Sequence, residues 1–505
     1  MSSSPPQSPS PLAGAAALVA GVRGAVWLSA DGEVESIPHD EAARRLGQGA
    51  PALVCHSRTT ARRLGVSFVD AFDLLELFAF VRPARFCLPT PRGLAGALDL
   101  PLPPTMENEA ECLFAAARVL LGELGGADDS ALAVGWAMAR GGWPWAPAVL
   151  SALGAGEAPS PGVIADGLKV WNRLKEWPDH PPAPPSGNQP VSAGEARQRL
   201  ARLVGSAAEA RPQQADYAAA CAAAFAPREQ AGAPNFVLAD AGTGVGKTLG
   251  YIAPASLWAE KNQATVWFST FTRNLQRQLD AELDRLYPDP AEKARRVVVR
   301  KGRENYFCLL NFAEAVSRIP PGAGGETTAL GLMARWALAS RDGDMVGGDF
   351  PAWLAGLLGR QATVDLTDTR GECIYSACLH YRKCFVERSI RAARRAAIVV
   401  ANHALIMTQA ALGGGDDTVL AERYVIDEGH HLFTAADNAF SAHLSGHETA
   451  ELRRWIVGPE EGSRSPSRSR GLKARIEDLV AGDEAAAGAL DEALRAARAL
   501  PGPGW

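Results

Sequence analysis

Short apolar runs alternate with longer stretches of helical spacing along most of the chain. This alternation predicts an α/β protein, because strands are short and continuous whereas helices repeat their apolar positions every three to four residues. Helical stretches are expected at residues 71–81 and 107–121. The apolar runs that we expect to be strands are residues 25–28, 52–55, 236–238, 264–268 and 424–426.

The pattern divides the chain into segments of different character. Residues 1–14 are a Ser/Pro tail that is too polar to fold, and Pro, Gly and Ser dominate residues 154–193, as in a linker. Trp171 and Trp177 in this linker either dock on a neighbouring domain or anchor a single helix. The expected segments are a disordered tail (1–14), a small α/β domain (15–125), a helical segment with a linker (126–193), a nucleotide-binding domain (194–440) and a helical tail (441–505).

Composition sets limits on partners and location. The 505 residues are 47% apolar and 21% charged with a net charge of −5, so a nucleic-acid surface must be a local basic patch. The apolar run at residues 12–22 is short and lacks a preceding cationic segment, unlike a signal peptide or a membrane span. We therefore expect a cytoplasmic protein without a membrane partner.

A glycine-rich turn follows the apolar run at residues 236–238. Its glycines let successive backbone N–H groups point at a phosphate chain, next to the positive end of a new helix. Lys247 would reach the β- and γ-phosphates, and the Thr248 hydroxyl would hold Mg²⁺. The alternative is a glycine-rich turn that binds nothing, against which the Lys-Thr pair argues. The turn contains Ala241, Gly242, Thr243, Gly244, Val245 and Gly246.

Two further motifs fit a nucleoside triphosphatase. Arg211 and Gln214 precede the turn by about thirty residues and could clamp an adenine edge, although Gln on a helix is usually only solvated. The run at 424–426 ends in Asp427 and Glu428, which would coordinate Mg²⁺ and activate the attacking water. His430 completes a D-E-x-H box that would relay to nucleic acid.

Several segments have the character of a nucleic-acid surface. Thr270, Thr272 and Asn274 follow an expected strand and could bond phosphodiester oxygens, or simply cap a helix. Residues 293–303 contain six cations and no anion, and more cations surround Cys384. Interleaved aromatic residues suit stacking on unpaired bases, and a solvated basic face is the alternative. These aromatics are Tyr306, Phe307, Tyr375, Tyr381 and Phe385.

Four of the eight cysteines gather in one part of the chain. Their pattern is a single cysteine followed at a distance by C-x₄-C-x₅-C, which lacks the C-x₂-C pairs of zinc ribbons. The wide spacing favours an iron–sulfur cluster, with zinc or unrelated thiols as alternatives. The four are Cys308, Cys373, Cys378 and Cys384.

The motifs RPQQADY, ADAGTGVGKTLGYIAPA, STFTRNLQRQL, KGRENYFC, VVANHALI and VIDEGHHLF closely resemble the DinG branch of superfamily 2 helicases, relatives of XPD, over about residues 210–440. The resemblance implies a RecA-like parallel sheet that binds ATP and Mg²⁺, and a [4Fe-4S] domain inserted at about residues 305–390. It implies 5′ to 3′ translocation on single-stranded or forked DNA in repair or replication. DNA contacts implied by motif match are Thr270, Thr272, Asn274, Arg303, Tyr306, Asn402 and His403.

The two ends of the chain depart from a complete helicase of this kind. Residues 24–125 resemble part of a DnaQ-type, RNase H-like exonuclease that has lost most metal-binding carboxylates, with Asp73 and Glu111 as survivors; an unrelated α/β domain is the alternative. After residue 440 we find no second RecA-like lobe, only the start of an arch-like helical domain. A partner chain or a missing C-terminal half would supply that lobe. The alternative function is a non-catalytic module that binds ATP and DNA.

Overall fold

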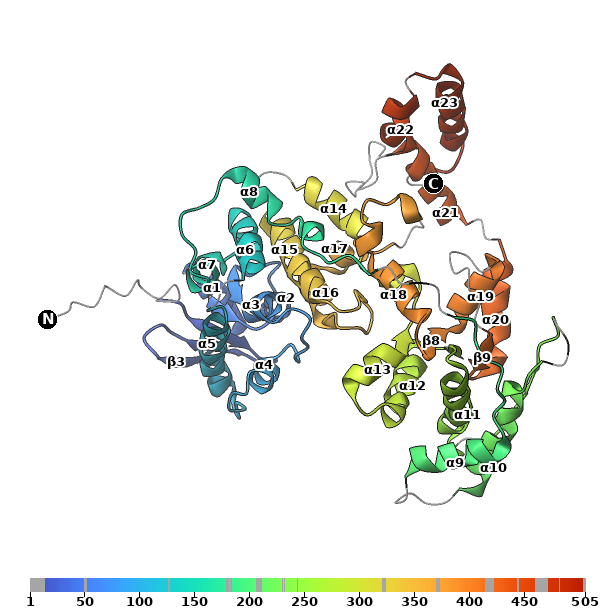
Figure 1. Cartoon of the computed structure of the whole chain (residues 1–505). Helices are drawn as coiled ribbons and strands as arrows, with labels where there is room; N and C mark the ends of the chain where they lie inside the picture. The colour runs from blue at the N-terminus through green and yellow to red at the C-terminus, as the bar shows by residue number, and fades with distance from the viewer. Residues whose placement is uncertain are drawn as a thin grey trace. The chain divides into compact units, whose positions relative to one another are not determined.

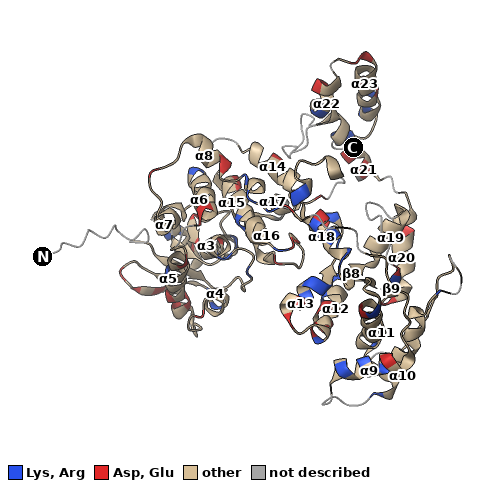
Figure 2. Cartoon of the chain, in the orientation of Figure 1, with Lys and Arg blue, Asp and Glu red and all other residues tan. Residues whose placement is uncertain are grey.

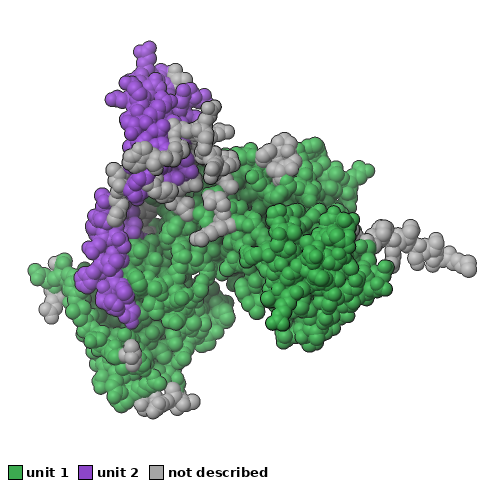
Figure 3. All heavy atoms as spheres, turned by 180° about the vertical axis from the view of Figure 1, so that it is seen from behind, with its two compact units in different colours: residues 1–405, 417–427 green, residues 406–416, 428–505 purple. Residues whose placement is uncertain are grey.

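The computed structural model divides the chain into two compact units, which are described separately (Figure 3). The first comprises residues 1–405 and 417–427, and the second residues 406–416 and 428–505. Thr243, most of the N-terminal tail and the low-complexity stretch at 459–470 lie outside the described residues. The described residues are 14–49, 52–125, 128–178, 181, 184–205, 211–228, 230, 232–242, 244–319, 324–368, 373–413, 422–442, 445–458, 471–480 and 482–502.

The N-terminal part of the first unit is built on a mixed five-stranded sheet of order β3-β2-β1-β4-β5 (Figure 1). The first three strands form an antiparallel meander, and β4 and β5 run parallel to β1. The strands expected at 25–28 and 52–55 are confirmed. The strands are β1 (Ala17–Ala20), β2 (Ala25–Leu28), β3 (Val34–Ile37), β4 (Ala52–Val54) and β5 (Ala71–Asp73).

Helices cover this sheet and continue past it. The helix expected at residues 71–81 begins only at Leu74, because Ala71–Asp73 pairs with β4 and Asp73 then caps the helix. The helices are α1 (His39–Leu46), α2 (Ser57–Leu64), α3 (Leu74–Val81), α4 (Pro91–Ala97), α5 (Met106–Glu123), α6 (Asp129–Arg140), α7 (Ala146–Ala152), α8 (Pro161–Asp166) and the short η1 (Val170–Asn172).

The cysteine-bearing insertion packs onto the N-terminal part. A single apolar cluster runs from the N-terminal sheet and helices through to residues of the insertion. Large rings fill it, including the fully buried Trp145, Trp336 and Phe307. The helices of the insertion are α14 (Leu309–Ser317), α15 (Gly324–Ala339), α16 (Ala352–Leu358), α17 (Arg360–Val364) and α18 (Phe385–Ala393), with the short η3 (Arg303–Asn305), η4 (Tyr375–Ala377) and η5 (Tyr381–Lys383).

The rest of the first unit is built on a parallel four-stranded sheet of order β7-β8-β6-β9. A parallel α/β sheet agrees with the expected RecA-like class. The strands are β6 (Val266–Thr270), β7 (Val297–Val299), β8 (Ile398–Asn402) and β9 (Arg423–Ile426). The helices are α9 (Ala193–Val204), α10 (Pro212–Cys221), η2 (Ala222–Phe225), α11 (Lys247–Asn262), α12 (Arg273–Leu286) and α13 (Pro290–Arg296).

One strand prediction in this region was wrong, and another was correct about the strand but wrong about its burial. Residues 236–238 form no strand, and Phe236 and Leu238 are 83% and 98% exposed, because no neighbouring strand pairs with them. The strand at 424–426 does form, but it is an edge strand rather than a buried one. Tyr424 and Ile426 are both about two-fifths exposed. An unpaired edge leaves one side of β9 in contact with solvent.

The second unit consists of helices, as the Ala/Glu/Arg-rich tail predicts. Arg453 ties α21 to the end of α23 through hydrogen bonds of 2.6 Å to the carbonyls of Arg498 and Leu500. Within the described residues, no helix combines the length and apolar character needed to cross a bilayer. The helices are η6 (Gly429–His431), α20 (Leu432–Phe440), α21 (Gly446–Val457), α22 (Leu472–Val480) and α23 (Glu484–Arg498), and α19 (His403–Ala411) links the units.

Candidate nucleotide and metal sites

The glycine-rich turn leads directly into the N-terminus of α11. Gly244 and Gly246 have φ angles of +84° and +87°, which side chains with a Cβ rarely adopt. Gly246 is the N-cap of the helix, so Lys247 and Thr248 lie half-buried in its first turn. The N–H groups of a first helical turn have no partner within the helix, and together with the helix dipole they favour an anion here. Ala241, Gly242 and Val245 complete the described part of the predicted phosphate cradle.

Arg211 and Gln214 bond to the turn itself. The Gln214 Nε2 donates to the Gly246 carbonyl over 2.8 Å, and the Arg211 guanidinium donates to the Gly244 carbonyl over 3.0 Å. Gln214 is only 6% exposed. A Cβ on Gly246 would lie 2.2 Å from the Gln214 amide, so the close approach requires glycine. Both residues, which we expected at an adenine, therefore support the shape of the cradle.

Polar side chains from three neighbouring strands meet at the carboxyl edge of the parallel sheet. Thr270 at the end of β6 lies in register with Asn402 at the end of β8. The Asp427 amide, directly after β9, donates to the Ser269 carbonyl over 2.8 Å. Ligands of open α/β sheets bind at the carboxyl ends of strands, so this edge is the candidate site.

The first turn of α11 lies beside this edge. The rings of Tyr251 and Phe268 are 5.7 Å apart, and Phe268 is two residues from the end of β6. Tyr251 is four residues, or about 6 Å along the helix axis, from Lys247. Packing of α11 on β6 therefore places the cradle on the side of the sheet where Asp427 emerges.

Glu428 and His430 belong to the second unit and are described with it. The Glu428 backbone is left-handed, with φ of +53°, an uncommon conformation for a residue with a side chain. Its carboxylate lies 3.6 Å from the His430 Nδ1, and the His430 and His431 rings are 4.0 Å apart. Their predicted catalytic roles stay predictions.

The structure gives several predicted DNA contacts roles within the fold. Thr272 is the N-cap of α12 and accepts the Leu275 amide at 3.2 Å, which is the alternative that the sequence left open. Asn402 likewise accepts the Leu405 amide at 2.9 Å. His403 is 1% exposed and its Nδ1 lies 2.6 Å from the Ser269 hydroxyl. Asn274 is exposed on α12, and among the described contacts its side chain has no capping role of this kind.

Base stacking by the aromatic residues was predicted too broadly. Tyr306, Phe307 and Phe385 are at most 3% exposed, so no ring face is open to a base. Tyr306 instead bonds to Ser389, with 3.2 Å between the two hydroxyl oxygens. Tyr375 is 46% exposed, so it still meets the requirement of stacking for an exposed ring. The cations of α13 and α18 are visible among the Lys and Arg residues of Figure 2.

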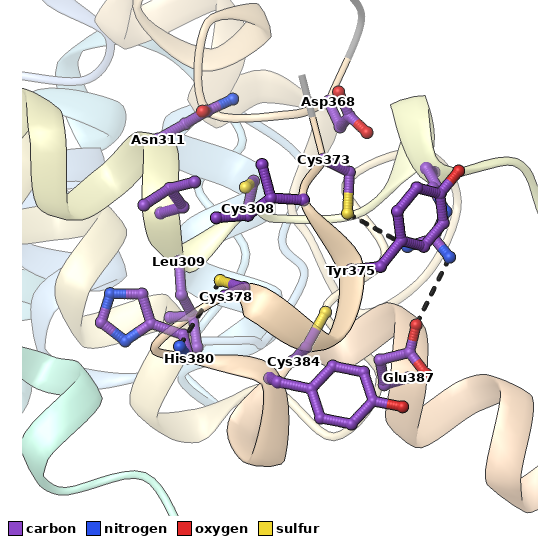
Figure 4. Close-up of a pocket in the computed structure, with 14 residues that line it drawn as sticks. Cys308, Leu309, Asn311, Asp368, Cys373, Tyr375, Cys378, His380, Cys384 and Glu387 are labelled. Atoms are coloured by element: carbon purple, nitrogen blue, oxygen red, sulfur yellow. Dashed lines mark hydrogen bonds and ion pairs between the residues drawn. The ribbon is translucent and has the colours of Figure 1, made fainter. Parts of the chain in front are cut away.

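The four clustered cysteines line one pocket (Figure 4). Their sulfur atoms face a common space, although the cysteines come from separate segments of the insertion. Cys308 immediately precedes α14, and Cys384 immediately precedes α18. Cys373 and Cys378 come from the intervening loop. The fold thus assembles a set of four thiols that the sequence could only propose.

Burial makes the thiols of Cys308 and Cys384 hard to ionise without a metal. It raises the pKa of Cys308 to about 12 and of Cys384 to about 11, against backbone N–H groups that favour the thiolates. Within the described residues, no three His, Cys, Asp or Glu side chains converge closely enough to hold a single ion. The donor set fits an iron–sulfur cluster, which distributes its thiolates around several iron atoms.

Charged residues complete the pocket, and of these the sequence analysis singled out only Arg303. Glu387, 4% exposed, lines it one turn after Cys384 and pairs with Arg303 at 3.3 Å. The Arg303 guanidinium also donates to the Cys373 sulfur over 3.4 Å and lies 4.5 Å from the centre of the Tyr375 ring. Arg303, predicted to contact DNA, therefore faces the cysteines. The i to i+3 spacing from Cys384 was the only sequence signal for Glu387.

Comparison with curated proteins confirms the predicted resemblance to DinG-type helicases. The chain is 31% identical over 224 residues to "ATP-dependent DNA helicase YoaA" of Escherichia coli, which covers 44% of this chain and 34% of the relative. It is 31% identical over 295 residues to "ATP-dependent helicase DinG" of Mycobacterium tuberculosis (53% and 42%). It is 30% identical over 234 residues to "3'-5' exonuclease DinG" of Bacillus subtilis (45% and 22%). The matches span less than half of each relative's length, and no family model matches.

Proposed function

We propose that this chain, which is similar over about half its length to DinG-type ATP-dependent DNA helicases, is the ATP-binding part of such a helicase. The observations that carry the proposal are the bond from the Asp427 amide to Ser269 near the end of β6 and the packing of α11, which follows the cradle, on the same strand. In this function Lys247 contacts the β- and γ-phosphates, and Thr248 and Asp427 hold Mg²⁺. Glu428 activates water, with His430 beside it.

The proposed motor acts on DNA. Hydrolysis would drive 5′ to 3′ movement on single-stranded DNA and unwinding of forked duplexes, with a second lobe supplied elsewhere in a longer protein or by a partner chain. The exposed Arg295 and Arg296 of α13 and Arg388 of α18, with exposed Asn274 and Tyr375, are proposed to contact the DNA backbone and bases. The N-terminal domain is proposed to be a degenerate exonuclease-like fold.

A [4Fe-4S] cluster is the proposed cofactor of the insertion. Cys308, Cys373, Cys378 and Cys384 would be its ligands, and the cluster would cross-link segments that are distant in sequence. Arg303 and the backbone N–H of His380, 3.4 Å from the Cys378 sulfur, would donate hydrogen bonds to ligand sulfurs. Such bonds stabilise thiolates in a buried site.

The deciding experiment is ATP hydrolysis by anaerobically purified protein with and without single-stranded DNA. Wild-type protein, Lys247→Ala and the matched control Lys261→Ala, at the other end of α11, would be compared. We expect DNA-stimulated hydrolysis that is lost only in Lys247→Ala. Binding of ATP and DNA without any turnover would instead support the non-catalytic module, and absence of ATP binding would refute both.

A further inference from the structure

Part of the linker predicted from composition is an ordered strap. Residues 168–177, called the strap below, begin in the core that the N-terminal part shares with the insertion. Leu168 and Val170 are 3% and 0% exposed within that core. A Cβ on the preceding Gly167 would lie 2.2 Å from the Ala133 carbonyl of α6, so the strap is pressed against this helix.

The far end of the strap is bonded to the loop between Cys378 and Cys384. The Trp177 indole donates to the Tyr381 carbonyl over 3.0 Å, and its backbone amide donates to the Arg382 carbonyl over 2.9 Å. Two bonds from one residue to successive carbonyls fix the path of the loop backbone. Lys383 adds a bond of 2.7 Å to the Trp171 carbonyl.

Aromatic contacts reinforce these bonds. Trp177 is 7% exposed, its ring is perpendicular to Tyr381 at 5.8 Å, and the Arg391 guanidinium lies 3.4 Å from its centre. A cation held over a desolvated indole adds to the attraction. Trp171 contacts His380 at 5.4 Å and Phe312 of α14 at 6.2 Å. The strap therefore touches both the loop and the helix that follows Cys308.

The N-terminal part also reaches the cysteines through α15. Buried Arg335 donates to the Phe80 carbonyl and to Asp128, each over 3.0 Å. The adjacent Trp336 contacts Phe307 at 5.6 Å, and Phe307 contacts Phe385 at 6.3 Å. Phe307 and Phe385 are the chain neighbours of Cys308 and Cys384. Two independent routes thus connect the N-terminal part to the cysteine pocket.

We propose that the strap, with the N-terminal domain that anchors it, is the scaffold of the cysteine pocket, and that Trp177 is the residue that positions the loop between Cys378 and Cys384. The proposal assigns the N-terminal domain a function that does not depend on nuclease chemistry. Its consequence for cofactor retention rests on the proposed iron–sulfur function, whereas its consequence for the free thiols does not.

The first test uses the full chain without a cofactor. Alkylation rates of individual cysteines by iodoacetamide would be followed by mass spectrometry in wild type, Trp177→Ala, Trp177→Phe and the control Trp27→Ala, in the N-terminal sheet. We expect Trp177→Ala to raise the rates of Cys378 and Cys384 about tenfold, because the indole hydrogen bond to the Tyr381 carbonyl and the ring contacts with Tyr381 and Arg391 are lost. Buried Cys87 and Cys112 are internal references and should keep their wild-type rates.

Unchanged rates at Cys378 and Cys384 in Trp177→Ala would overturn the proposal. If Cys87 and Cys112 also became reactive, Trp177→Ala would have lost its fold. The proposal would then be tested by Trp177→Phe. That variant keeps the ring but lacks the indole N–H, so a smaller rise confined to the loop cysteines is expected. If the alkylation rates of Cys378 and Cys384 did not rise in Trp177→Phe, that result would likewise contradict the role of Trp177.

The second test follows the visible absorbance of anaerobically reconstituted protein after addition of an iron chelator. We expect the absorbance to decay several-fold faster in Trp177→Ala than in wild type or Trp27→Ala, since the loop that carries two ligands opens more often. Equal decay rates would contradict the proposal. Failure of every variant, wild type included, to take up a cluster would refute the proposed cofactor, while the thiol rates would still test the strap.

Discussion

The two sheets of the first unit each place an aspartate at the carboxyl end of a strand, but the two aspartates have different surroundings. Asp73, after β5, is 1% exposed and accepts the amides of His56, Ser57 and Leu75. Asp427, after β9, is half-buried at an edge that it shares with Ser269 and the cradle. A carboxylate saturated by backbone N–H groups stabilises a fold, whereas one at the carboxyl edge of a parallel sheet lies where ligands of such sheets bind. Position at a strand end alone does not distinguish the two.

The largest effect is expected at Asp427. Asp427→Asn keeps the shape of the side chain but removes the charge that would hold Mg²⁺, so Mg²⁺-dependent ATP affinity should fall at least about tenfold. Titration with a fluorescent ATP analogue would measure it. Glu422→Gln, just before the start of the same strand, is the control and should bind like wild type. Equal affinities in all three proteins would remove Asp427 from the proposed site.

Asp73 should instead determine stability. Asp73→Ala leaves three backbone N–H groups without their acceptor in a buried place, and the free energy of unfolding should fall by about 3 kcal/mol. Urea unfolding followed by tryptophan fluorescence would measure the change, with exposed Asp70→Ala as the control. If Asp73→Ala had the same free energy of unfolding as wild type, the carboxylate would be dispensable for folding and the inferred stabilising role would be wrong.

Glu76 makes the stability of the N-terminal domain depend on pH. Burial, together with the nearby Asp73 carboxylate, raises its pKa from 4.5 to about 8, and the carboxyl accepts the Trp143 indole N–H at 2.8 Å. The folded state binds the proton more tightly than the unfolded state, so stability should fall as pH rises from about 5 to about 8.

The matched variants for this effect are Glu76→Gln and exposed Glu111→Gln. Glu76→Gln retains an acceptor for Trp143 but cannot ionise, so its melting temperature should exceed that of wild type at pH 8.5 and approach it at pH 5. Glu111→Gln should follow wild type at both values. Parallel pH profiles for wild type and Glu76→Gln would show that the pKa of Glu76 is the same in the folded and unfolded states, which would contradict the raised value.

The smallest effect is expected at Thr272, the N-cap of α12. Thr272→Ala removes the N-cap of α12 and should lower the free energy of unfolding by about 1 kcal/mol. Affinity for single-stranded DNA, measured by fluorescence anisotropy, should be unchanged in Thr272→Ala and reduced in Asn274→Ala, which carries an exposed amide on the same helix. Loss of DNA affinity in Thr272→Ala at wild-type stability would restore the predicted DNA contact.

The residues themselves determined much of this protein. Glycines at positions with left-handed backbone, the Lys247-Thr248 pair after them, and apolar runs that end in polar residues are local patterns, and local geometry is enough to make them predictable. The α/β class and the helical tail follow from periodicity for the same reason. The spacing of the four cysteines likewise indicated a common site before their sulfurs were seen to face one space.

Only the tertiary structure decided which side chains are buried and what they contact. Residues 236–238 have strand composition, but a strand exists only where another strand supplies its hydrogen bonds, and β9 remains an edge. Tyr306 and Phe385 resemble stacking residues until the shared core covers them. The strap lies within a stretch rich in linker residues, yet Trp177 contacts a loop about two hundred positions away. The sequence offered docking of Trp171 and Trp177 as one possibility, and their contacts confirm it, but long-range contacts leave no local periodicity that could identify the loop they hold.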